Sequence, residues 1–512
     1  LESWAKQQKG NWRALVGGID YELSPQGIPD TIKNVVIEMK PGEGLQVIYT
    51  KRLLPNYDIF DEEKYFTPGE NNTFYQFNGK TFGLLICEDM WASSFHHRDP
   101  CQDLRSEVLE KKISLDGIIN LSASPFEVLK KSKRIHRAQS LSQQFLCPFI
   151  YVNRVGGEDE ILFDGESFIC TEDKVILELT SFKEACQSFD LEDLPYQSKD
   201  KNFDSTTSNQ SFEGNEQNQT PQGNSWENLF NPQLCFKSSP PELISWGQEE
   251  CQKVLDGLIF GFQEYAQKNG FKKFLVALSG GIDSALVLAI AKISLRDDQK
   301  LEAIYMPSIH SSQLSTELCE KMCHQIHVPL SYLPIKFIHA SIKNLFTQTF
   351  KEPFDGLTDE NIQSRIRGAF LYTRSNQTQS LVINTSNKSE LSVGYSTQYG
   401  DSVGALSLLG DLYKTEVFVL SEFINANYGP MIPEAIINRG PTAELRPDQK
   451  DTDSLPPYKR LDAILEGVLS YRLDQSELIR LGFPKDEVQR VFNLYLKSEY
   501  KRQQFCPIIK VK

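Results

Sequence analysis

The stretch Ala277–Ser284, ALSGGIDS, constrains the fold of this chain more than any other. An apolar run, Lys273–Leu278, leads into it, and an apolar helical pattern that reaches Ile293 follows it, so two glycines stand between a strand and a helix. Successive backbone N–H groups in such a turn form a concave anion site, and the helix N-terminus adds positive potential. The sequence therefore predicts a phosphate-binding loop in an α/β domain.

The loop lacks the lysine of the nucleoside-triphosphate loop GxxxxGK[ST]. Without that lysine it is poorly suited to transfer of a γ-phosphoryl group and better suited to hold a pyrophosphate that leaves as one unit. The alternative is an ordinary strand–helix turn in which Ser279 caps the helix. The preceding strand, together with Asp283 and Ser284, favours the phosphate site.

Strands and helices alternate around this loop. A helix is expected over Glu249–Lys268 before it, and after it a strand over Leu301–Met306, a helix over Gln313–His327 and a strand over Leu330–Pro334. This β-α-β-α-β order predicts a doubly wound parallel sheet. We place this domain at residues 243–512.

Residues 1–186 also alternate between strand-like and helix-like segments. Strand-length runs rich in Val and Ile are Lys33–Met39, Gln46–Tyr49, Phe82–Ile86, Gly117–Leu121 and Pro148–Val152. Helices are expected over Ser106–Ile113 and Phe126–Phe145. The pattern indicates a layered α/β domain.

Residues 187–242 are polar and contain very few apolar side chains. Such a stretch cannot bury enough apolar surface to offset the entropy lost on ordering. We interpret it as a linker or a long surface loop; a functional lid is the alternative.

Composition excludes several function classes. Lys and Arg number 54 against 68 Asp and Glu, a net charge of −14, which argues against a nucleic-acid partner. No apolar run approaches the roughly 20 residues that cross a bilayer, so we expect no membrane partner. Ten irregularly spaced cysteines fit a reduced compartment, and we expect a cytoplasmic protein.

Five further segments narrow the function of the second domain. ENIQSRIRG begins at Glu360, TSNKSELSVGYSTQYGD at Thr385, GDLYKT at Gly410, PTAEL at Pro441 and YKRQ at Tyr500. ALSGGIDS resembles the SGGxDS pyrophosphate loop of the N-type ATP pyrophosphatases, whose fold is adenine-nucleotide alpha-hydrolase-like. The order and approximate spacing of all these segments, over residues 241–507, are similar to those of NAD synthetases.

The resemblance implies that ATP adenylates the nicotinate carboxylate of deamido-NAD and that pyrophosphate leaves. It implies ATP as co-substrate and Mg²⁺ as cofactor, with Asp283 and Glu390 as the metal ligands; hard carboxylate oxygens suit Mg²⁺. Ser279 is carried over as an active-site residue. The implied ATP-binding residues are Ala277, Leu278, Ser279, Gly280, Gly281, Ile282, Asp283, Ser284, Thr385, Lys414 and Thr442. The implied deamido-NAD-binding residues are Asn361, Glu390, Tyr395, Ser396, Thr397 and Lys501.

The first domain carries a candidate thiol nucleophile. Cys87 follows the strand FGLLI, and a buried structural cysteine is the ordinary interpretation of such a residue. The segments TKRLLPNY from Thr50 and GGEDEILFDGES from Gly156 resemble the nitrilase-type glutamine amidohydrolase domain that precedes many NAD synthetases. That family has an α-β-β-α sandwich and a Glu–Lys–Cys triad. The resemblance assigns Cys87 as nucleophile, Lys51 as the lysine, and Tyr57, Ser124 and Lys130 to glutamine.

The glutamate of the triad has no counterpart in the sequence. The resemblance places it ahead of Leu1, together with roughly the first strand and helix of the sandwich. Glu62 matches an acidic position after the lysine that is not the usual base. We expect the glutamate to be encoded ahead of Leu1; the alternative is a copy without glutaminase activity.

Taken together, the resemblances imply a homo-oligomeric enzyme that uses ammonia from glutamine to make NAD. The alternatives are an ammonia-dependent synthetase with an inactive nitrilase domain, another pyrophosphate-loop ligase, and a non-catalytic nucleotide-binding scaffold. Two other motifs favour structural roles. Cys319, Cys323 and His324 lack the second ligand pair of a zinc site and are expected in the core. His96 and His97 are expected in a solvated loop.

Overall fold

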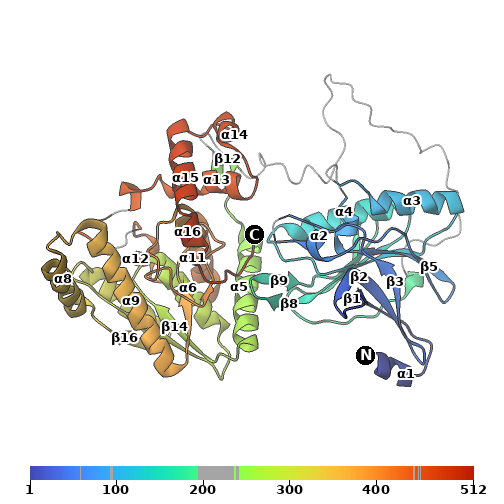
Figure 1. Ribbon diagram of the computed structural model, residues 1–512, viewed down its shortest axis with the longest axis horizontal. Coiled ribbons are helices and arrows are strands. Elements are labelled where there is room, and N and C mark those ends of the chain that lie inside the picture. The colour runs from blue at the N-terminus through green and yellow to red at the C-terminus, as the bar shows by residue number, and fades with distance from the viewer. Residues whose placement is uncertain are drawn as a thin grey trace. The chain divides into compact units, whose positions relative to one another are not determined.

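The computed structural model describes residues 1–57, 59–92, 96–193, 236–237, 241–441, 444–447, 449 and 451–512. The chain forms two compact units (Figure 1). Unit 1 comprises Leu1–Pro125, Leu129–Gly156 and Phe163–Phe230, and unit 2 comprises Phe126–Val128, Gly157–Leu162 and Asn231–Lys512. Most of the polar stretch 187–242, namely 194–235 and 238–240, lies outside the described residues. Within the described ranges, no helix is long and apolar enough to span a membrane.

Unit 1 contains two sheets. An antiparallel sheet has the order β1-β2-β3, and a mixed sheet has the order β11-β10-β7-β6-β5-β4 with β5, β6 and β7 parallel. The first comprises β1 (Ala14–Leu23), β2 (Pro29–Lys40) and β3 (Gly44–Thr50). The second comprises β4 (Phe74–Phe77), β5 (Lys80–Ile86), β6 (Gly117–Ser122), β7 (Phe149–Asn153), β10 (Phe168–Cys170) and β11 (Val175–Glu178). A short hairpin, β8 (Val155–Glu158) and β9 (Ile161–Asp164), follows β7.

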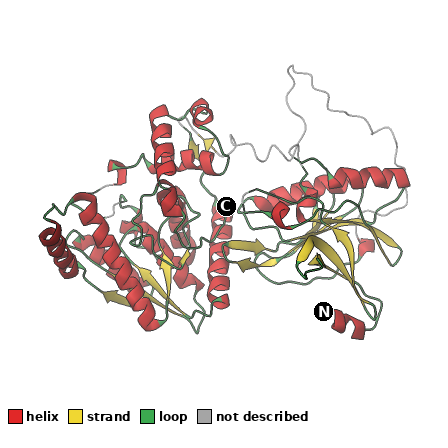
Figure 2. Ribbon diagram, in the orientation of Figure 1, coloured by secondary structure: helices red, strands yellow, loops and turns green. Residues whose placement is uncertain are grey.

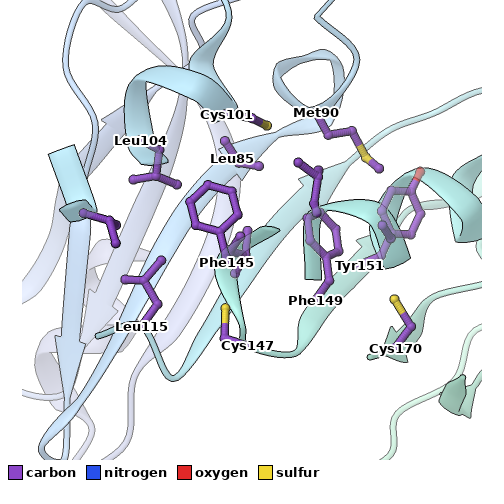
Figure 3. Close-up of a cluster of buried hydrophobic side chains, with 14 of the residues drawn as sticks. Leu85, Met90, Cys101, Leu104, Leu115, Phe145, Cys147, Phe149, Tyr151 and Cys170 are labelled. Atoms are coloured by element: carbon purple, nitrogen blue, oxygen red, sulfur yellow. The ribbon is translucent and has the colours of Figure 1, made fainter. Parts of the chain in front are cut away.

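Two apolar cores define the layers of unit 1. Helices α3 (Pro100–Lys111) and α4 (Lys130–Phe145) pack Leu104 and Phe145 against Phe149 of β7, in the cluster drawn in Figure 3. On the other face of the mixed sheet, Phe82 and Leu84 pack against Val36 of the antiparallel sheet. The layers are therefore helix, sheet and sheet. The described part of the unit also contains the short helices α1 (Glu2–Gln7) and α2 (Glu62–Tyr65) and the 3₁₀ helices η1 (Cys87–Met90) and η2 (Leu191–Asp193).

Unit 2 is built on a parallel sheet of order β16-β15-β14-β17-β18. Its strands are β14 (Lys273–Ala277), β15 (Lys300–Tyr305), β16 (Leu330–Tyr332), β17 (Leu381–Asn384) and β18 (Leu406–Ser407). Adjacent residues of β14 point to opposite faces. Phe274 stacks on Phe262 of α5 (Gln248–Lys268), whereas Leu275 packs with Ile366 of α9 (Gly356–Thr378), so helices cover both faces.

The remaining helices of unit 2 surround this sheet and extend beyond it (Figure 2). They are α6 (Ile282–Ser294), α7 (Gln313–Gln325), α8 (Lys336–Phe350), α10 (Lys388–Val393), α11 (Lys414–Tyr428), α12 (Glu434–Ile437), α13 (Tyr458–Leu469), α14 (Gln475–Arg480), α15 (Lys485–Lys497) and α16 (Glu499–Arg502). A separate core joins α13, α14 and α15, next to the short strands β12 (Phe236–Lys237) and β13 (Glu242–Leu243).

The predicted doubly wound sheet is confirmed. The chain runs outward from β14 to β16 and then returns to β17 on the other side of β14, so the order reverses between β14 and β17. Ligands of such sheets bind at the carboxyl ends of the strands at this reversal. The residues that follow β14 and β17, which include Ser279 and Thr385, stand at that place.

Two helices of unit 1 start at residues other than those that the sequence predicts. Helix α3 begins at Pro100, because the Asp99 carboxylate accepts hydrogen bonds from the N–H groups of Cys101 and Gln102 and caps the helix. Helix α4 begins at Lys130 rather than Phe126. The residues ahead of it form long-range backbone hydrogen bonds instead, for example from Phe126 N–H to the Leu162 carbonyl at 2.7 Å.

Candidate active sites

The loop Ser279–Gly281 joins β14 to α6 and leaves the N-terminus of α6 facing a cavity. Gly280 has a φ of +83°, and a Cβ there would lie 3.0 Å from the Ser315 carbonyl oxygen, so glycine is required. The Ser284 hydroxyl accepts from Ser279 N–H at 3.1 Å, and the Ser279 hydroxyl accepts from Gly281 N–H at 3.2 Å. The two serine side chains therefore hold the turn in the shape of an anion site.

The cavity next to this loop has a volume of about 560 Å³, and most of the expected synthetase residues line it. These are Ala277, Leu278, Ser279, Gly281, Ile282, Asp283, Ser284, Asn361, Thr385, Glu390, Tyr395, Ser396, Thr397, Lys414 and Lys501. Gly280 belongs to the loop without lining the cavity, and Thr442 lies outside the described residues. Segments that are far apart in the sequence of unit 2 thus line the same cavity.

A buried lysine joins the two expected metal ligands. The Lys414 ammonium donates to Asp283 Oδ2 and, at 3.2 Å, to Glu390 Oε1. Asn387 donates its amide N–H to Asp283 Oδ1 at 2.9 Å. Burial raises the pKa of Glu390 well above its usual range; Lys414 lowers that pKa, and the charges of Asp283 and Asp451 raise it further. The Lys414 ammonium is thus shared between two carboxylates, and the charge of Asp451 acts on both Lys414 and Glu390.

The residues expected at deamido-NAD form another wall of the cavity, on α9, α10, the turn after α10, and α16. The Thr397 hydroxyl donates to Asn361 Oδ1 at 2.9 Å. The Lys501 ammonium donates to the carbonyls of Gly394 and Ser396 at 2.7 and 2.6 Å, and so closes that turn. The Tyr395 hydroxyl donates to Asp451 at 3.3 Å.

Two residues of this site were not identified from the sequence. Asn387 caps α10 by accepting from Glu390 N–H at 3.0 Å while its amide holds Asp283. The pattern N-x-x-E, which is typical of a helix start, could have identified it. Asp451 accepts from the hydroxyls of Tyr458 and Tyr395, a contact between segments far apart in the chain that no local pattern indicates.

The thiol of unit 1 lies at a strained turn. Cys87 follows β5 with a φ of +44°, in the left-handed region that a residue with a side chain seldom adopts. Its N–H donates to Asn120 Oδ1 at 2.8 Å, and its carbonyl accepts from Asn120 Nδ2 at 3.4 Å. Asn120 lies on β6 and is fully buried, so the neighbouring strand fixes the peptide of Cys87 from both sides.

Lys51 directly follows β3 and is buried, with its ammonium 2.7 Å from both carboxylate oxygens of Glu62. Burial raises the pKa of the Cys87 thiol; the charges of Lys51 and Lys130 lower that pKa, and those of Glu88 and Glu62 raise it. The charges of these four groups therefore all affect the pKa of the Cys87 thiol. The resting thiol is neutral near pH 7, so it must lose its proton before or during attack on a substrate.

The expected glutamine-binding residues occupy three positions around this thiol. The Tyr57 hydroxyl donates to Glu88, next to Cys87, at 2.9 Å. Lys130 is the first residue of α4. Ser124 is buried, and its hydroxyl accepts from Arg134 at 3.2 Å, so in this structure it contacts the buried Arg134–Asp164 ion pair.

Asp89 is a site residue that was not identified from the sequence. Its buried carboxylate accepts from the N–H groups of Ile86, Arg52 and Leu53 at 2.8–3.0 Å, and from the Tyr49 hydroxyl at 2.8 Å. Asp89 therefore joins the backbone before Cys87 to the backbone after Lys51. An acidic residue two positions after a strand-end cysteine was the available signal.

The other motifs take structural positions. Cys319 and Cys323 are buried on α7, and no group of three metal-ligating side chains gathers anywhere in the described ranges. His97 is exposed, but His96 Nε2 lies 3.9 Å from Glu88 Oε1 beside the thiol site. His96 thus lies in a loop, as expected, with its side chain 22% exposed.

Known proteins resemble the chain along most of its length. A family model described as NAD synthase matches residues 254–505. A glutamine-dependent NAD(+) synthetase of Acinetobacter baylyi is 38% identical over 480 residues, which cover 92% of this chain and 77% of that protein. One of Aquifex aeolicus is 36% identical over 461 residues, 89% of this chain and 77% of that protein.

A solved structure is similar as well. The glutamine-dependent NAD+ synthetase of Acinetobacter baumannii, in complex with ADP, superposes with a TM-score of 0.64 at 31% identity. The match covers 96% of this chain and 80% of that chain.

Proposed function

The chain belongs to the family of glutamine-dependent NAD(+) synthetases, and on this premise we propose how its two sites divide the reaction. The enzyme is a ligase. In unit 2, ATP adenylates the nicotinate carboxylate of deamido-NAD and pyrophosphate leaves. In unit 1, glutamine is hydrolysed, and its ammonia displaces AMP from the adenylate to give NAD.

The observation that carries this proposal is the cluster of Asp283, Lys414 and Glu390 at the mouth of the phosphate loop. The loop amides and the α6 N-terminus bind the phosphates that leave as pyrophosphate. The Lys414 ammonium neutralises negative charge that develops at the phosphates during adenylation. Its position is fixed before substrate arrives, because the side chain is only 3% exposed.

The donor set at this cluster fits Mg²⁺, which we propose as the cofactor. Asp283 and Glu390 would hold it, because the two carboxylates converge on one ammonium and the nearby Asp451 adds a third negative charge. Bound there, Mg²⁺ would neutralise phosphate charge and orient the triphosphate of ATP. Asn387, which donates to Asp283 Oδ1, holds that carboxylate in the orientation it needs.

In unit 1, we propose Cys87 as the nucleophile that attacks the glutamine carboxamide and Lys51 as the cation that stabilises the resulting oxyanion. The sulfur–carbon bond forms as the thiol proton passes to the departing amide nitrogen, and the carbon–nitrogen bond breaks to release ammonia. Water then hydrolyses the resulting thioester, which gives glutamate and returns the free thiol. Glu62 holds Lys51 in place, and Asn120 holds the Cys87 turn. Tyr57, Ser124 and Lys130 are the proposed contacts of glutamine.

Labelled glutamine tests this assignment directly. With glutamine carrying ¹⁵N in its amide, ATP and deamido-NAD, we expect the amide nitrogen of NAD to carry the label, measured by mass spectrometry. An excess of unlabelled ammonium should dilute that label only slightly if ammonia passes between the sites without release. NAD without label, formed while glutamine is consumed, would contradict the coupled reaction.

We propose that the enzyme is a homo-oligomer assembled through α8. This helix exposes Phe337, Leu345 and Phe350 at 73%, 62% and 61%, and Leu357 at the start of α9 is 73% exposed. Monomers seldom expose so many large apolar side chains together.

Light scattering after size exclusion should give at least twice the chain mass of 58.3 kDa. The double variant Phe337→Asp/Phe350→Asp should give the single-chain mass. The control Leu496→Asp alters an exposed apolar residue on α15 and should leave the mass unchanged. A wild-type protein of single-chain mass would overturn the proposal.

We propose a cytoplasmic location on the basis of the thiols. The nine cysteines in the described part of the chain are all free, and six of them are buried. Free thiols persist in reducing compartments.

A further inference from the structure

Residues Pro507–Lys512, here called the 507–512 segment, extend the edge of the unit 2 sheet. Ser407 of β18 donates its N–H to the Pro507 carbonyl at 2.8 Å, and Ile509 donates to the Ser407 carbonyl at 3.1 Å. Ile509 and Val511 are fully buried. The segment is thus a strand-like part of the fold.

The other edge of the segment is also bonded. Ile508 and Lys510 donate their N–H groups to the side chain and the carbonyl of Glu160, at 3.1 and 3.0 Å. Val128 donates to the Val511 carbonyl at 2.9 Å. Both edges of the segment are therefore hydrogen-bonded within unit 2. The segment has a fixed position, and it can hold in place the side chains that it contacts.

One contact of the segment is Asp411, three residues before Lys414. Asp411 Oδ2 accepts from the N–H groups of Val511 and Lys512, each at 2.8 Å. Its Oδ1 accepts from the ammonium of Lys388, the first residue of α10, at 2.8 Å. Asp411 therefore joins the 507–512 segment to both parts of the nucleotide site, the start of α11 and the start of α10.

The second contact is the side chain of Lys512. Its ammonium lies 2.7 Å from Glu416 and 3.4 Å from Glu466, and 4.5 Å from the ring centre of Tyr413. Glu416 in turn accepts from Tyr413 N–H at 2.8 Å, which caps α11 directly before Lys414. A cation whose side chain is 14% exposed thus holds the first turn of the helix that carries Lys414.

We propose that the 507–512 segment, through Asp411 and Lys512, is a positioning element that holds Lys414 and α10 at the phosphate loop. The proposal rests on the role of Lys414 in adenylation proposed above. Neither positioning residue lines the cavity, so each acts through Lys414 rather than on the substrate. A displacement of about 1 Å in a group that meets a transition state can lower a rate by about 10²-fold.

The test measures NAD formation with saturating ammonium as the nitrogen donor, so that unit 1 chemistry is not required. Lys512→Met and Asp411→Asn should each lower kcat by about 10- to 100-fold while KM for deamido-NAD changes less than about threefold. Lys512→Arg keeps a cation between Glu416 and Glu466 and should restore most of kcat. Glutamate release from glutamine should stay close to wild type in all of them.

Lys510→Met is the matched control, because this lysine belongs to the same segment and its ammonium has no ion-pair partner among the described residues. It should behave as wild type. If wild-type protein makes no NAD from deamido-NAD, the proposed function fails. If the wild type is active and both Lys512→Met and Asp411→Asn keep kcat within about twofold, the positioning role fails instead. Loss of folded protein in both variants, judged by circular dichroism, would overturn it in favour of a purely structural role.

Discussion

A Cys87→Ala variant is expected to form NAD from ammonia at close to the wild-type rate, and from glutamine at a rate lower by about 10³-fold or more. The reason is that the substitution removes the proposed nucleophile of unit 1, whereas the proposed adenylation site lies in unit 2. Initial rates of NAD formation with each nitrogen donor, together with glutamate release, measure the effect.

Cys101→Ala is the matched control for this prediction. Cys101 is a buried thiol of α3 with 3% exposure, and its sulfur donates to the Asp89 carbonyl. It should retain both activities and lose some thermal stability, because a small cavity replaces the sulfur. Equal losses with glutamine and with ammonia in Cys87→Ala would show that Cys87 supports the fold rather than the chemistry.

A Lys414→Met variant is expected to lose NAD formation with both donors, again by about 10³-fold, while still releasing glutamate from glutamine. The substitution removes the ammonium that we propose to meet the phosphates, and it leaves Asp283 and Glu390 without their shared cation. Breaking a buried ion pair costs about 3–5 kcal/mol, so the melting temperature should fall as well. Release of AMP and pyrophosphate reports adenylation.

Two further variants separate the loss of charge from the loss of stability. Lys414→Met combined with Asp283→Asn removes one unpaired charge and should recover stability without activity. Lys272→Met breaks the exposed pair with Asp298, 2.7 Å long, and should change neither quantity measurably. Retention of more than a tenth of the wild-type rate in Lys414→Met would contradict the assigned role.

The parts of the fold that the sequence predicted well are those set by local pattern. β14 is apolar from Phe274 to Ala277, because the inner positions of a parallel strand that is covered on both faces are buried. The loop after it needs Gly280 at a positive φ, and so the glycine pair marks the turn. Cys87 was located in the same way, by the end of an apolar strand.

The parts that could not be predicted depend on partners far away in the chain. Residues 126–129 have helix-favouring neighbours, yet their N–H groups bond to Leu162 and Val511, and the helix starts later. Asp451 and Asp411 each gather donors from separate segments, which a single sequence does not reveal. Asn120 lies in the predicted strand Gly117–Leu121, but its hydrogen bond reaches Cys87 after β5, and that of Asp89 reaches Arg52 after β3.

The four hydrogen bonds to Asp89 couple the two halves of the proposed glutaminase site. The carboxylate that accepts from the backbone before the thiol also accepts from the backbone after Lys51. A shift of one of these two segments therefore displaces the other. Loss of these hydrogen bonds is therefore expected to displace the proposed nucleophile and the proposed cation together. A damaged enzyme is therefore expected to stop hydrolysing glutamine altogether. It would not continue to release ammonia from glutamine at a partly ordered site.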